Sequence, residues 1–190
     1  MDDYIRAEFE ESIATKTRFL DSPEFRKIAV IAEDCRVALS GGCRVFFMGN
    51  GGSFADSIHL AAEFVSRFKF DRAPLPAIAL GTNGSSTTAI GNDYGYDELF
   101  LRELSAFARG GDVVVALSTS GNSPNIVKAV EWAVEEGITC HGLSGAAGGR
   151  LATICQTICV PSSETARIQE THITIGHAIC GAVEQAIFST

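Results

Sequence analysis

The sequence predicts an α/β protein built on a five-stranded parallel sheet with helices on both faces. Short apolar runs alternate with segments of helical periodicity, which is the pattern of buried parallel strands joined by crossover helices. Two of the runs stop at turns rich in glycine and serine, 49–53 and 118–123, and a helical pattern starts directly after each turn. The 190 residues contain no repeat, linker or low-complexity segment, so one domain over 1–190 is expected.

The first 40 residues are expected to form two helices, over 2–20 and 23–40. The break between them is Asp21-Ser22-Pro23, where the serine can cap the second helix and the proline suits its first position. An apolar stripe follows the second helix, which ends at Gly41-Gly42. The first strand is expected at 45–48, and the helix after the 49–53 turn extends to about Arg67.

The remaining chain continues the alternation. Further strands are expected at 76–80, 112–117, 138–143 and 157–160, and further helices at about 96–108, 124–136 and 167–188. The segments GTNGSSTT (81–88) and GNDY (91–94) are expected to be loops. Ligands bind at the carboxyl ends of parallel strands. The segments 49–53, 81–93 and 118–123 should therefore lie at one edge of the sheet.

Composition excludes several classes of partner. A net charge of −8 argues against a nucleic-acid groove or an anionic membrane surface. No apolar run approaches the roughly 20 residues of a membrane-spanning helix, and the acidic start of the chain lacks the order of a signal peptide. The six cysteines form no CxxC pair and lie mainly in apolar segments. They are typical of core residues in a reducing compartment, and a cytoplasmic protein is expected.

Both glycine and serine turns are candidate anion sites. A turn between a strand and a helix presents backbone N–H groups and the positive end of the helix to a phosphate. Serine, glycine and asparagine also occur in such turns for capping alone, so one turn by itself does not decide between the two interpretations. Neither turn is a Walker loop, and GNGGS lacks the GxGxxG spacing. A small phosphorylated substrate is therefore favoured over a nucleotide.

The helix after the first turn carries His59 and Glu63 four residues apart, so both project from one face. The expected apolar face holds five residues, Phe54, Ile58, Ala61, Val65 and Phe68. By spacing alone, His59, Glu63 and Arg67 form a solvated face with an ion pair. Their position just after an anion-binding turn favours a catalytic role instead.

The last helix is apolar around almost its whole circumference, which is typical of a buried helix. Its main apolar face is expected to hold five residues, Ile168, Ile175, Ile179, Ala182 and Ala186. A narrow polar line through Glu170, His177 and Glu184 interrupts the apolar surface. His172 points to the apolar side and is interpreted as structural. His177 is better placed for function, because glycine and cysteine neighbours leave space around it.

Four segments together resemble the phosphoheptose isomerases of the sugar isomerase (SIS) superfamily: GNGGSFADSIHLAAEF, GNDYG, GDVVVALSTSGNSPNIVKA and ARIQETHITIGH. The resemblance covers nearly the whole chain, although STSGNS alone marks only the superfamily. It implies a flavodoxin-like three-layer α/β/α sandwich over 41–190, with the helices of 1–40 packing an oligomer. It also implies conversion of sedoheptulose 7-phosphate to D-glycero-D-manno-heptose 7-phosphate, the first step toward activated heptose for lipopolysaccharide or other surface glycans. A homotetramer with active sites between subunits and one zinc ion per subunit are implied as well.

Carried over position by position, the resemblance implies specific site residues. The zinc ligands would be His59, Glu63, Gln169 and His177. The phosphate would lie against Ser118, Thr119, Ser120 and Ser123. The sugar would contact Gly51, Gly52, Ser53, Asn92 and Asp93, together with Glu63 and Gln169.

The implied reaction moves a proton between C1 and C2 through an enediol. Glu63 suits the base that carries this proton, and His177 suits the acid and base serving the oxygens. Glu63 cannot be a tight metal ligand and a free base at once, and we favour the base. Gln169 and His177 are eight residues apart, about 12 Å along one helix. Either Gln169 lies at the helix start or the metal site draws on two chains.

The sequence departs from the family pattern at two positions. Phe54 stands where some members have histidine, and Ala166 where some have aspartate, which bears on substrate choice. SETARIQE also resembles the non-catalytic SIS proteins that bind the replication initiator DnaA, but those lack the pair matching Glu63 and His177. An isomerase of pentose or amino-sugar phosphates is a third alternative, although this chain shows none of the extra domains that such enzymes often carry.

Overall fold

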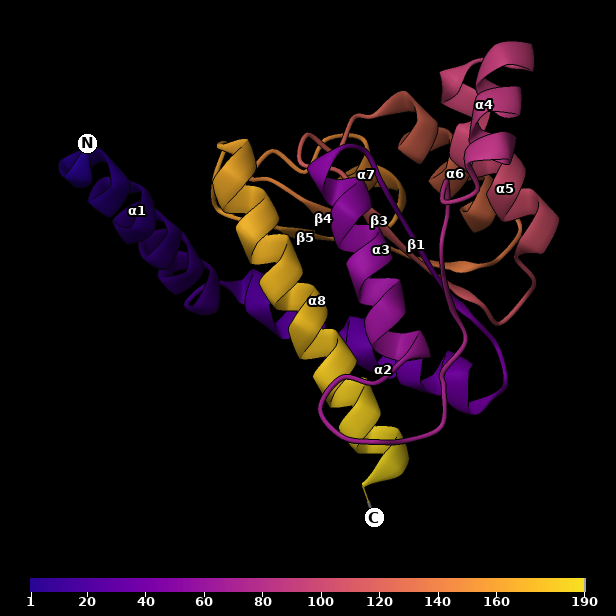
Figure 1. The fold of residues 1–190 in the computed structure, drawn as a ribbon, viewed down its shortest axis with the longest axis horizontal. Helices are drawn as coiled ribbons and strands as arrows, with labels where there is room; N and C mark the ends of the chain where they lie inside the picture. The colour runs from indigo at the N-terminus through magenta and orange to yellow at the C-terminus, as the bar shows by residue number, and fades with distance from the viewer. Residues whose placement is uncertain (190) are drawn as a thin grey trace.

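A computed structural model describes residues 1–189 and confirms the predicted fold class (Figure 1). All five strands are parallel, in the order β2-β1-β3-β4-β5, which is the flavodoxin-like order. The strands are β1 (Val45–Gly49), β2 (Ala77–Ala79), β3 (Val113–Leu117), β4 (Thr139–Ser144) and β5 (Gln156–Cys159). β1 and β3 pair in the middle of the sheet, from Val45 opposite Val113 to Gly49 opposite Leu117. The turns that follow these two strands therefore start side by side.

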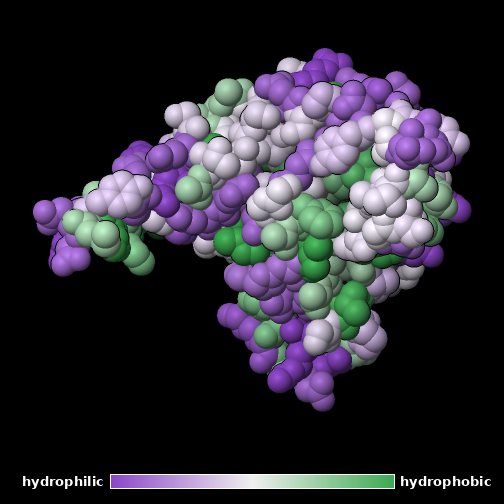
Figure 2. All heavy atoms as spheres, turned by 45° about the horizontal axis from the view of Figure 1, so that its top comes forward, coloured by the Kyte–Doolittle hydropathy of each residue, from purple (hydrophilic) through white to green (hydrophobic). Residues whose placement is uncertain are grey.

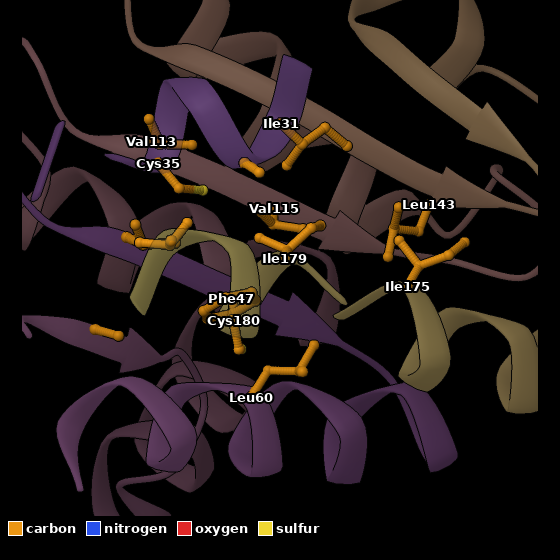
Figure 3. Packing of buried hydrophobic residues seen from close by; sticks show 14 of the residues in the cluster. Ile31, Cys35, Phe47, Leu60, Val113, Val115, Leu143, Ile175, Ile179 and Cys180 are labelled. Carbon is orange, nitrogen blue, oxygen red and sulfur yellow. The ribbon is translucent and has the colours of Figure 1, made fainter. Parts of the chain in front are cut away.

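Helices cover both faces of the sheet. They are α1 (Asp2–Leu20), α2 (Lys27–Ser40), α3 (Gly52–Val65), α4 (Gly84–Asp93), α5 (Leu99–Phe107), α6 (Pro124–Glu135), α7 (Leu151–Ile154) and α8 (Thr165–Phe188), with 3-10 turns at Pro23–Arg26 and Tyr96–Glu98. Alternate strand residues separate two cores. Phe47 and Val115 pack with α2, α3 and α8 (Figure 3). On the other face, Phe46 and Val114 pack with α5 and α6.

Two local predictions are wrong. The segment expected to be a loop over 81–94 contains helix α4, whose N-cap Asn83 accepts hydrogen bonds from the backbone N–H groups of Ser85 and Ser86. This helix was missed because it has no buried residue, and so no apolar periodicity marks it. Ser22 does not cap the second helix. Its hydroxyl donates to the carbonyl of Phe19 instead.

The buried face of α3 is rotated from the face that the spacing predicted, and the two share only Ala61. Leu60 and Phe64 are buried, whereas the predicted core residues Ile58 and Val65 are 41% and 49% exposed. The register is set by α8, which approaches α3 at Gly176. A Cβ atom at Gly176 would overlap the side chain of Leu60. Ile58 and Val65 are thus left as apolar groups on the outer surface of α3.

Helix α8 carries a second correction, at Glu184. The predicted polar line would place this carboxylate at the surface, but its side chain is buried and paired with Arg72. Ala182 and Ala186, predicted on the apolar face, are exposed. The reason is that Arg72 lies in a loop 112 residues earlier in the chain. Helical periodicity depends on residues within one helix, so it cannot indicate a partner so distant in the sequence.

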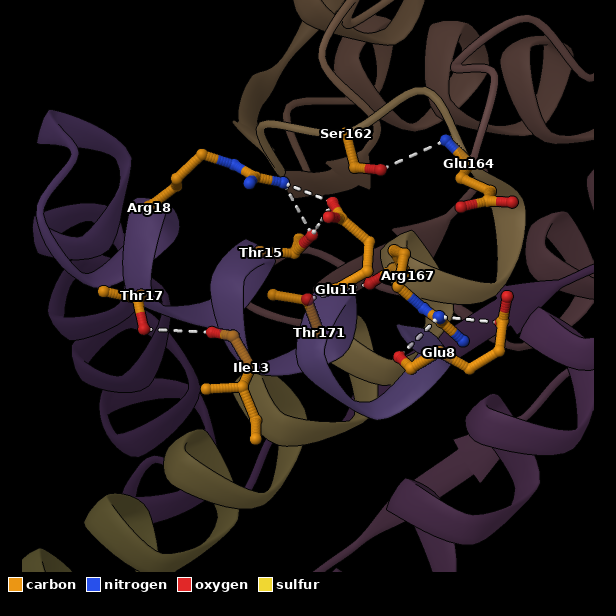
Figure 4. Close-up of polar contacts among 10 residues, drawn as sticks. All are labelled: Glu8, Glu11, Ile13, Thr15, Thr17, Arg18, Ser162, Glu164, Arg167 and Thr171. Carbon is orange, nitrogen blue, oxygen red and sulfur yellow. Dashed lines mark hydrogen bonds and ion pairs between the residues drawn. The ribbon is translucent and has the colours of Figure 1, made fainter. Parts of the chain in front are cut away.

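Helix α1 extends away from the sheet and packs against α8 (Figure 1). The buried guanidinium of Arg167 in α8 donates to the carbonyl and the carboxylate of Glu8, both at 2.9 Å, and to Glu170 at 2.6 Å (Figure 4 draws the bonds to Glu8). Along the rest of α1, large apolar side chains are exposed: Tyr4, Ile5, Phe9, Ile13 and Leu20. The helix is therefore anchored by the contacts of Arg167 with Glu8 and by the buried Phe19, and it leaves an apolar stripe uncovered within the described chain.

The outer edge of the sheet at β5 is held by one side chain of the 3-10 turn Pro23–Arg26 and by the first residue of α2. Lys27 Nζ donates to the carbonyl of Thr157 at 2.8 Å, and Glu24 accepts the backbone N–H of Cys159 at 2.7 Å. These two residues also pair with each other. Thr157 and Cys159 belong to β5, so the exposed side of this edge strand has partners for two of its backbone groups.

Within residues 1–189, no helix combines the length and hydropathy of a membrane span.

The buried His172 should make folding stability depend on pH. Burial lowers the pKa of His172 to about 4, although its hydrogen bond to the carbonyl of Ser144 acts in the opposite direction. Because the unfolded chain takes up this proton near the ordinary pKa of 6.5, stability is complete above that pH and falls as the pH drops toward 4. The expected slope is about 1.4 kcal/mol per pH unit from this group. Urea unfolding at pH 7 and pH 5 measures it, and a His172→Gln variant with the same slope would contradict the assignment.

Candidate active site

Three side chains that could hold a metal ion converge between α3 and α8. His59 and Glu63 come from α3, and His177 comes from α8. His59 Nε2 lies 2.9 Å from Glu63 Oε1 and 3.3 Å from His177 Nε2, and one ligand atom from each of the three lies within 4.8 Å of the others. The two imidazole rings are 5.0 Å apart between centroids. His59 and Glu63, the predicted pair on α3, therefore form a cluster of three with His177 from the last helix.

The fold brings these residues together through helix packing. His59 and Glu63 occupy one face of α3 because they are four residues apart. Leu60 lies against Gly176, directly before His177, so the close approach of the two helices places His177 opposite His59. The side chains of His59 and Glu63 are 48% and 23% exposed. The cluster is therefore open to solvent on one side, where a substrate can enter.

The donor set fits a divalent metal ion. Two imidazole nitrogens and one carboxylate oxygen are the ligands of catalytic zinc sites, which keep a further position for water or substrate. A solvated ion pair accounts for His59 and Glu63 but leaves the approach of His177 unexplained. The geometry supports a metal centre formed by these three residues.

Gln169 lies elsewhere in the same chain. It is in the same continuous helix as His177, near the start of α8, so the two are about 12 Å apart along the axis. Its amide packs against the first turn of α3, because a Cβ atom at Gly52 would lie 2.7 Å from both amide heteroatoms. Within one chain, Gln169 thus borders the GNGGS turn, and His59 lies about 10 Å further along α3.

Asp56 is a neighbour of the cluster that the sequence did not indicate. It precedes His59 by one turn of α3 and is half-buried, and its Oδ2 atom has no hydrogen-bond partner among the described residues. Burial raises the pKa of Asp56, while the nearby His59 and His177 act in the opposite direction. Only its spacing of three residues from His59 could have indicated it.

The serine-rich turn has the form expected of an anion site. It follows β3 and leads into α6, which begins at Pro124. Ser118 and Ser123 face each other with their hydroxyl oxygens 3.0 Å apart. Gly121 has φ +67°, and a Cβ atom there would overlap the carbonyl oxygen of Gly148, so only glycine fits. Thr119 is half-buried and Ser120 exposed in the same turn.

A pair of asparagines joins the two turns. Asn50 and Asn125 exchange two amide hydrogen bonds, both 3.0 Å long, and Tyr96 donates to Asn50 Oδ1 at 2.8 Å. Asn125 is buried at the start of α6. The GNGGS turn is thereby fixed relative to the serine-rich turn. This contact joins residues 75 positions apart, and no local pattern marks it.

The remaining predicted sugar contacts lie in different surroundings. Gly51, with φ +57°, and Gly52 are exposed at the turn, whereas Ser53 is buried in the first turn of α3. Asn92 and Asp93 are exposed at the end of α4, where the amide of Asn92 donates to Asp93 at 2.7 Å.

The two departures from the family pattern lie near these turns. Phe54 lines a small cavity of about 140 Å³ beside the GNGGS turn, with Tyr96 and Phe100. Ala166 is exposed in the first turn of α8.

Comparison with known proteins agrees with this geometry. The SIS domain family matches residues 8–145. The phosphoheptose isomerase of Aneurinibacillus thermoaerophilus is 51% identical over 99% of this chain and 96% of its own length. The structure of a phosphoheptose isomerase from Francisella tularensis superposes with a TM-score of 0.91, at 34% identity, covering 96% of this chain and 97% of that one.

A second solved structure gives the same result. Phosphoheptose isomerase from Neisseria gonorrhoeae superposes with a TM-score of 0.88, at 38% identity, over 96% of this chain and 98% of that one. These relatives are matched over almost their full lengths and share one activity by name. The chain therefore belongs to the SIS domain family and, within it, to the phosphoheptose isomerases.

Proposed function

We propose that this isomerase converts sedoheptulose 7-phosphate to D-glycero-D-manno-heptose 7-phosphate. The observation that carries the proposal is the convergence of His59, Glu63 and His177, because proton transfer beside a sugar carbonyl needs such groups at one point. Membership of the phosphoheptose isomerases supports a seven-carbon substrate.

In this proposal the two turns bind the substrate and the cluster performs the chemistry. The hydroxyls of the serine-rich turn, Ser118, Thr119, Ser120 and Ser123, bind the phosphate, together with backbone N–H groups at the start of α6. The sugar chain lies along the GNGGS turn, at Gly51, Gly52 and Ser53. Asn92, Asp93 and Gln169 contact its hydroxyls. This arrangement directs the reactive carbons toward α3.

Glu63 takes the proton from one carbon of the C1–C2 pair and returns it to the other. His177 gives a proton to the carbonyl oxygen and removes one from the neighbouring hydroxyl, so the carbonyl changes place with no net loss of protons. His59, His177 and Glu63, with Gln169, would hold a zinc ion. When bound, the ion supplies positive charge that polarises the carbonyl. Because a base must be free to move its proton, Glu63 is proposed to act mainly as the base.

We further propose that the enzyme is a homotetramer with active sites at subunit interfaces. Ile58 and Val65 leave apolar surface on α3 next to the cluster, and α1 carries its own uncovered stripe. Figure 2 shows green hydrophobic residues both on the projecting helix and on the body of the molecule. A neighbouring subunit covering α3 would close the open side of the cluster. It could also supply the Gln169 that the same chain places too far away.

The alternative of a non-catalytic protein that binds DnaA gives no reason for the convergence of His59, Glu63 and His177. No comparison favours that alternative. We propose a cytoplasmic location and a role in activated heptose synthesis for lipopolysaccharide or other surface glycans. The six free cysteines are consistent with a reducing compartment.

The decisive experiment is an assay of the purified protein with sedoheptulose 7-phosphate, with and without a chelator. The untreated enzyme should form the aldose phosphate. Prolonged chelation should lower turnover by about 100-fold or more, and added Zn²⁺ should restore it. Lack of turnover with the heptose phosphate would refute the substrate, whereas full turnover after complete metal removal would refute only the metal.

A further inference from the structure

The loop that follows α3 carries a buried ion pair with α8. Arg72 comes from this loop and Glu184 from the last turns of α8, with Nε and Oε1 3.0 Å apart. Their side chains are only 2% and 1% exposed. Such burial is costly for charged groups unless hydrogen bonds satisfy both of them. The other hydrogen bonds of Arg72 and Glu184 therefore show which parts of the structure this ion pair holds in place.

Glu184 holds the backbone of the loop. One of its carboxylate oxygens accepts the N–H of Phe68 at 2.9 Å, and the other accepts the N–H of Lys69 at 2.8 Å. Burial alone would raise the pKa of Glu184, but these two hydrogen bonds and the contact with Arg72 outweigh it, and the pKa lies below its ordinary value. Glu184 is thus a carboxylate at neutral pH, and its two oxygens fix the position of residues 68 and 69.

Phe68 in turn packs on the imidazole of His177. The two rings are stacked, with centroids 5.5 Å apart and planes inclined by 30°. The other aromatic neighbour of His177 is His59, whose ring meets it edge-on. The imidazole therefore contacts one ring that belongs to the cluster and one that Glu184 positions.

Arg72 reaches the other member of the cluster. Its guanidinium donates to the carbonyl of Glu63 at 2.8 Å and to the carbonyl of Phe64 at 2.6 Å. These carbonyls belong to the last turn of α3, where a cation is favourable. One buried ion pair thus contacts the backbone of Glu63 and, through Phe68, the ring of His177.

We propose that Glu184 is a positioning residue of the isomerase, which sets His177 through Phe68 and Glu63 through Arg72. The inference rests on the proposed roles of His177 and Glu63. A merely structural ion pair would change stability alone. A positioning pair also changes kcat and metal affinity, because both depend on the orientation of the cluster.

The test compares Glu184→Gln with Asp112→Asn. Asp112 is a matched control, since it is buried, accepts two backbone N–H groups at 2.8 Å, from Arg44 and Arg109, and lies at the opposite end of β3 from the serine-rich turn. Glu184→Gln should lower kcat and Zn²⁺ affinity by roughly 10- to 100-fold. Its KM should stay within about twofold, because the phosphate turn is not touched. Asp112→Asn should lose stability but keep kcat and Zn²⁺ affinity.

Phe68→Leu provides a second measurement that does not remove a buried charge. It keeps apolar contact but removes the stacked ring, and kcat should fall roughly 2- to 10-fold. If Glu184→Gln does not fold, this variant decides alone. Wild-type kcat and Zn²⁺ affinity in Phe68→Leu, and in Glu184→Gln if it folds, would overturn the proposal. If His177→Gln is nevertheless inactive, the proposed role of His177 is retained and only the positioning role of Glu184 is rejected. Full activity in His177→Gln would refute the role of His177 itself.

Discussion

Replacing Glu63 or His177 by glutamine should reduce turnover of sedoheptulose 7-phosphate by about 100- to 10,000-fold. Glutamine keeps the size of Glu63 and one carbonyl oxygen but cannot take up the proton. At position 177 it removes the imidazole that we propose exchanges protons with the substrate oxygens. Neither side chain belongs to the buried core. Both variants should therefore stay folded, with unfolding free energies within about 1 kcal/mol of the parent.

The measurement is a steady-state assay together with thermal unfolding. Glu98→Gln is a suitable control, because Glu98 is also partly exposed and paired with a cation, Lys128, in a different part of the molecule. Unchanged activity in both the Glu63 and the His177 variants would end the assignment of the cluster. Zn²⁺ affinity separates the two roles of Glu63: a glutamine variant that binds Zn²⁺ but does not turn over supports the base.

Charging the exposed stripe of α1 should dissociate the oligomer and inactivate the enzyme. Phe9 and Ile13 are 68% and 65% exposed, so Phe9→Glu with Ile13→Glu removes no core contact within one chain. If copies of α1 pack together, burying four or more new charges per assembly is strongly unfavourable. A site that needs a neighbouring subunit would then lose its geometry, and turnover should fall by about 100-fold.

Light scattering gives the oligomeric state, and circular dichroism checks that the chain remains folded. Ala7→Glu adds one negative charge on another face of α1 and should leave both the assembly and turnover unchanged. A fully active monomer with parental Zn²⁺ affinity would show that each chain contains a complete site. Gln169 would then have no role in metal binding, given its position beside Gly52.

The sequence predicted the sheet and its turns because their signals are local. Apolar runs and the glycines after them are contiguous in the sequence, and the placement of the turns at one edge of the sheet followed from the general rule for parallel strands. His59 and Glu63 were found for the same reason, as neighbours on one helical turn. Their partner His177 was singled out by its small neighbours. The roles of all three came from the family resemblance.

What the sequence did not predict depends on distant partners. In the sequence, Glu184 has the polarity of a surface residue, and only its pairing with Arg72 in the fold explains its burial. Asn125 is likewise not distinguished by its sequence neighbours, because its partner Asn50 lies 75 positions away. The orientation of α3 was predicted incorrectly, because which of Ile58 and Leu60 faces inward is decided by the glycine of α8 that Leu60 packs against. Helix α4 lacks buried residues, so its only local signal was the cap at Asn83.

The contacts of Glu24 and Lys27 with β5 have a consequence for how copies of this chain associate. The two side chains occupy the N–H of Cys159 and the carbonyl of Thr157, to which the backbone of a further strand would otherwise bind. The other outer strand, β2, spans only three residues. Neither outer strand therefore offers a long free edge to another chain. Copies of this chain that associate, as in the proposed tetramer, are expected to meet through helical surfaces instead of extending the sheet.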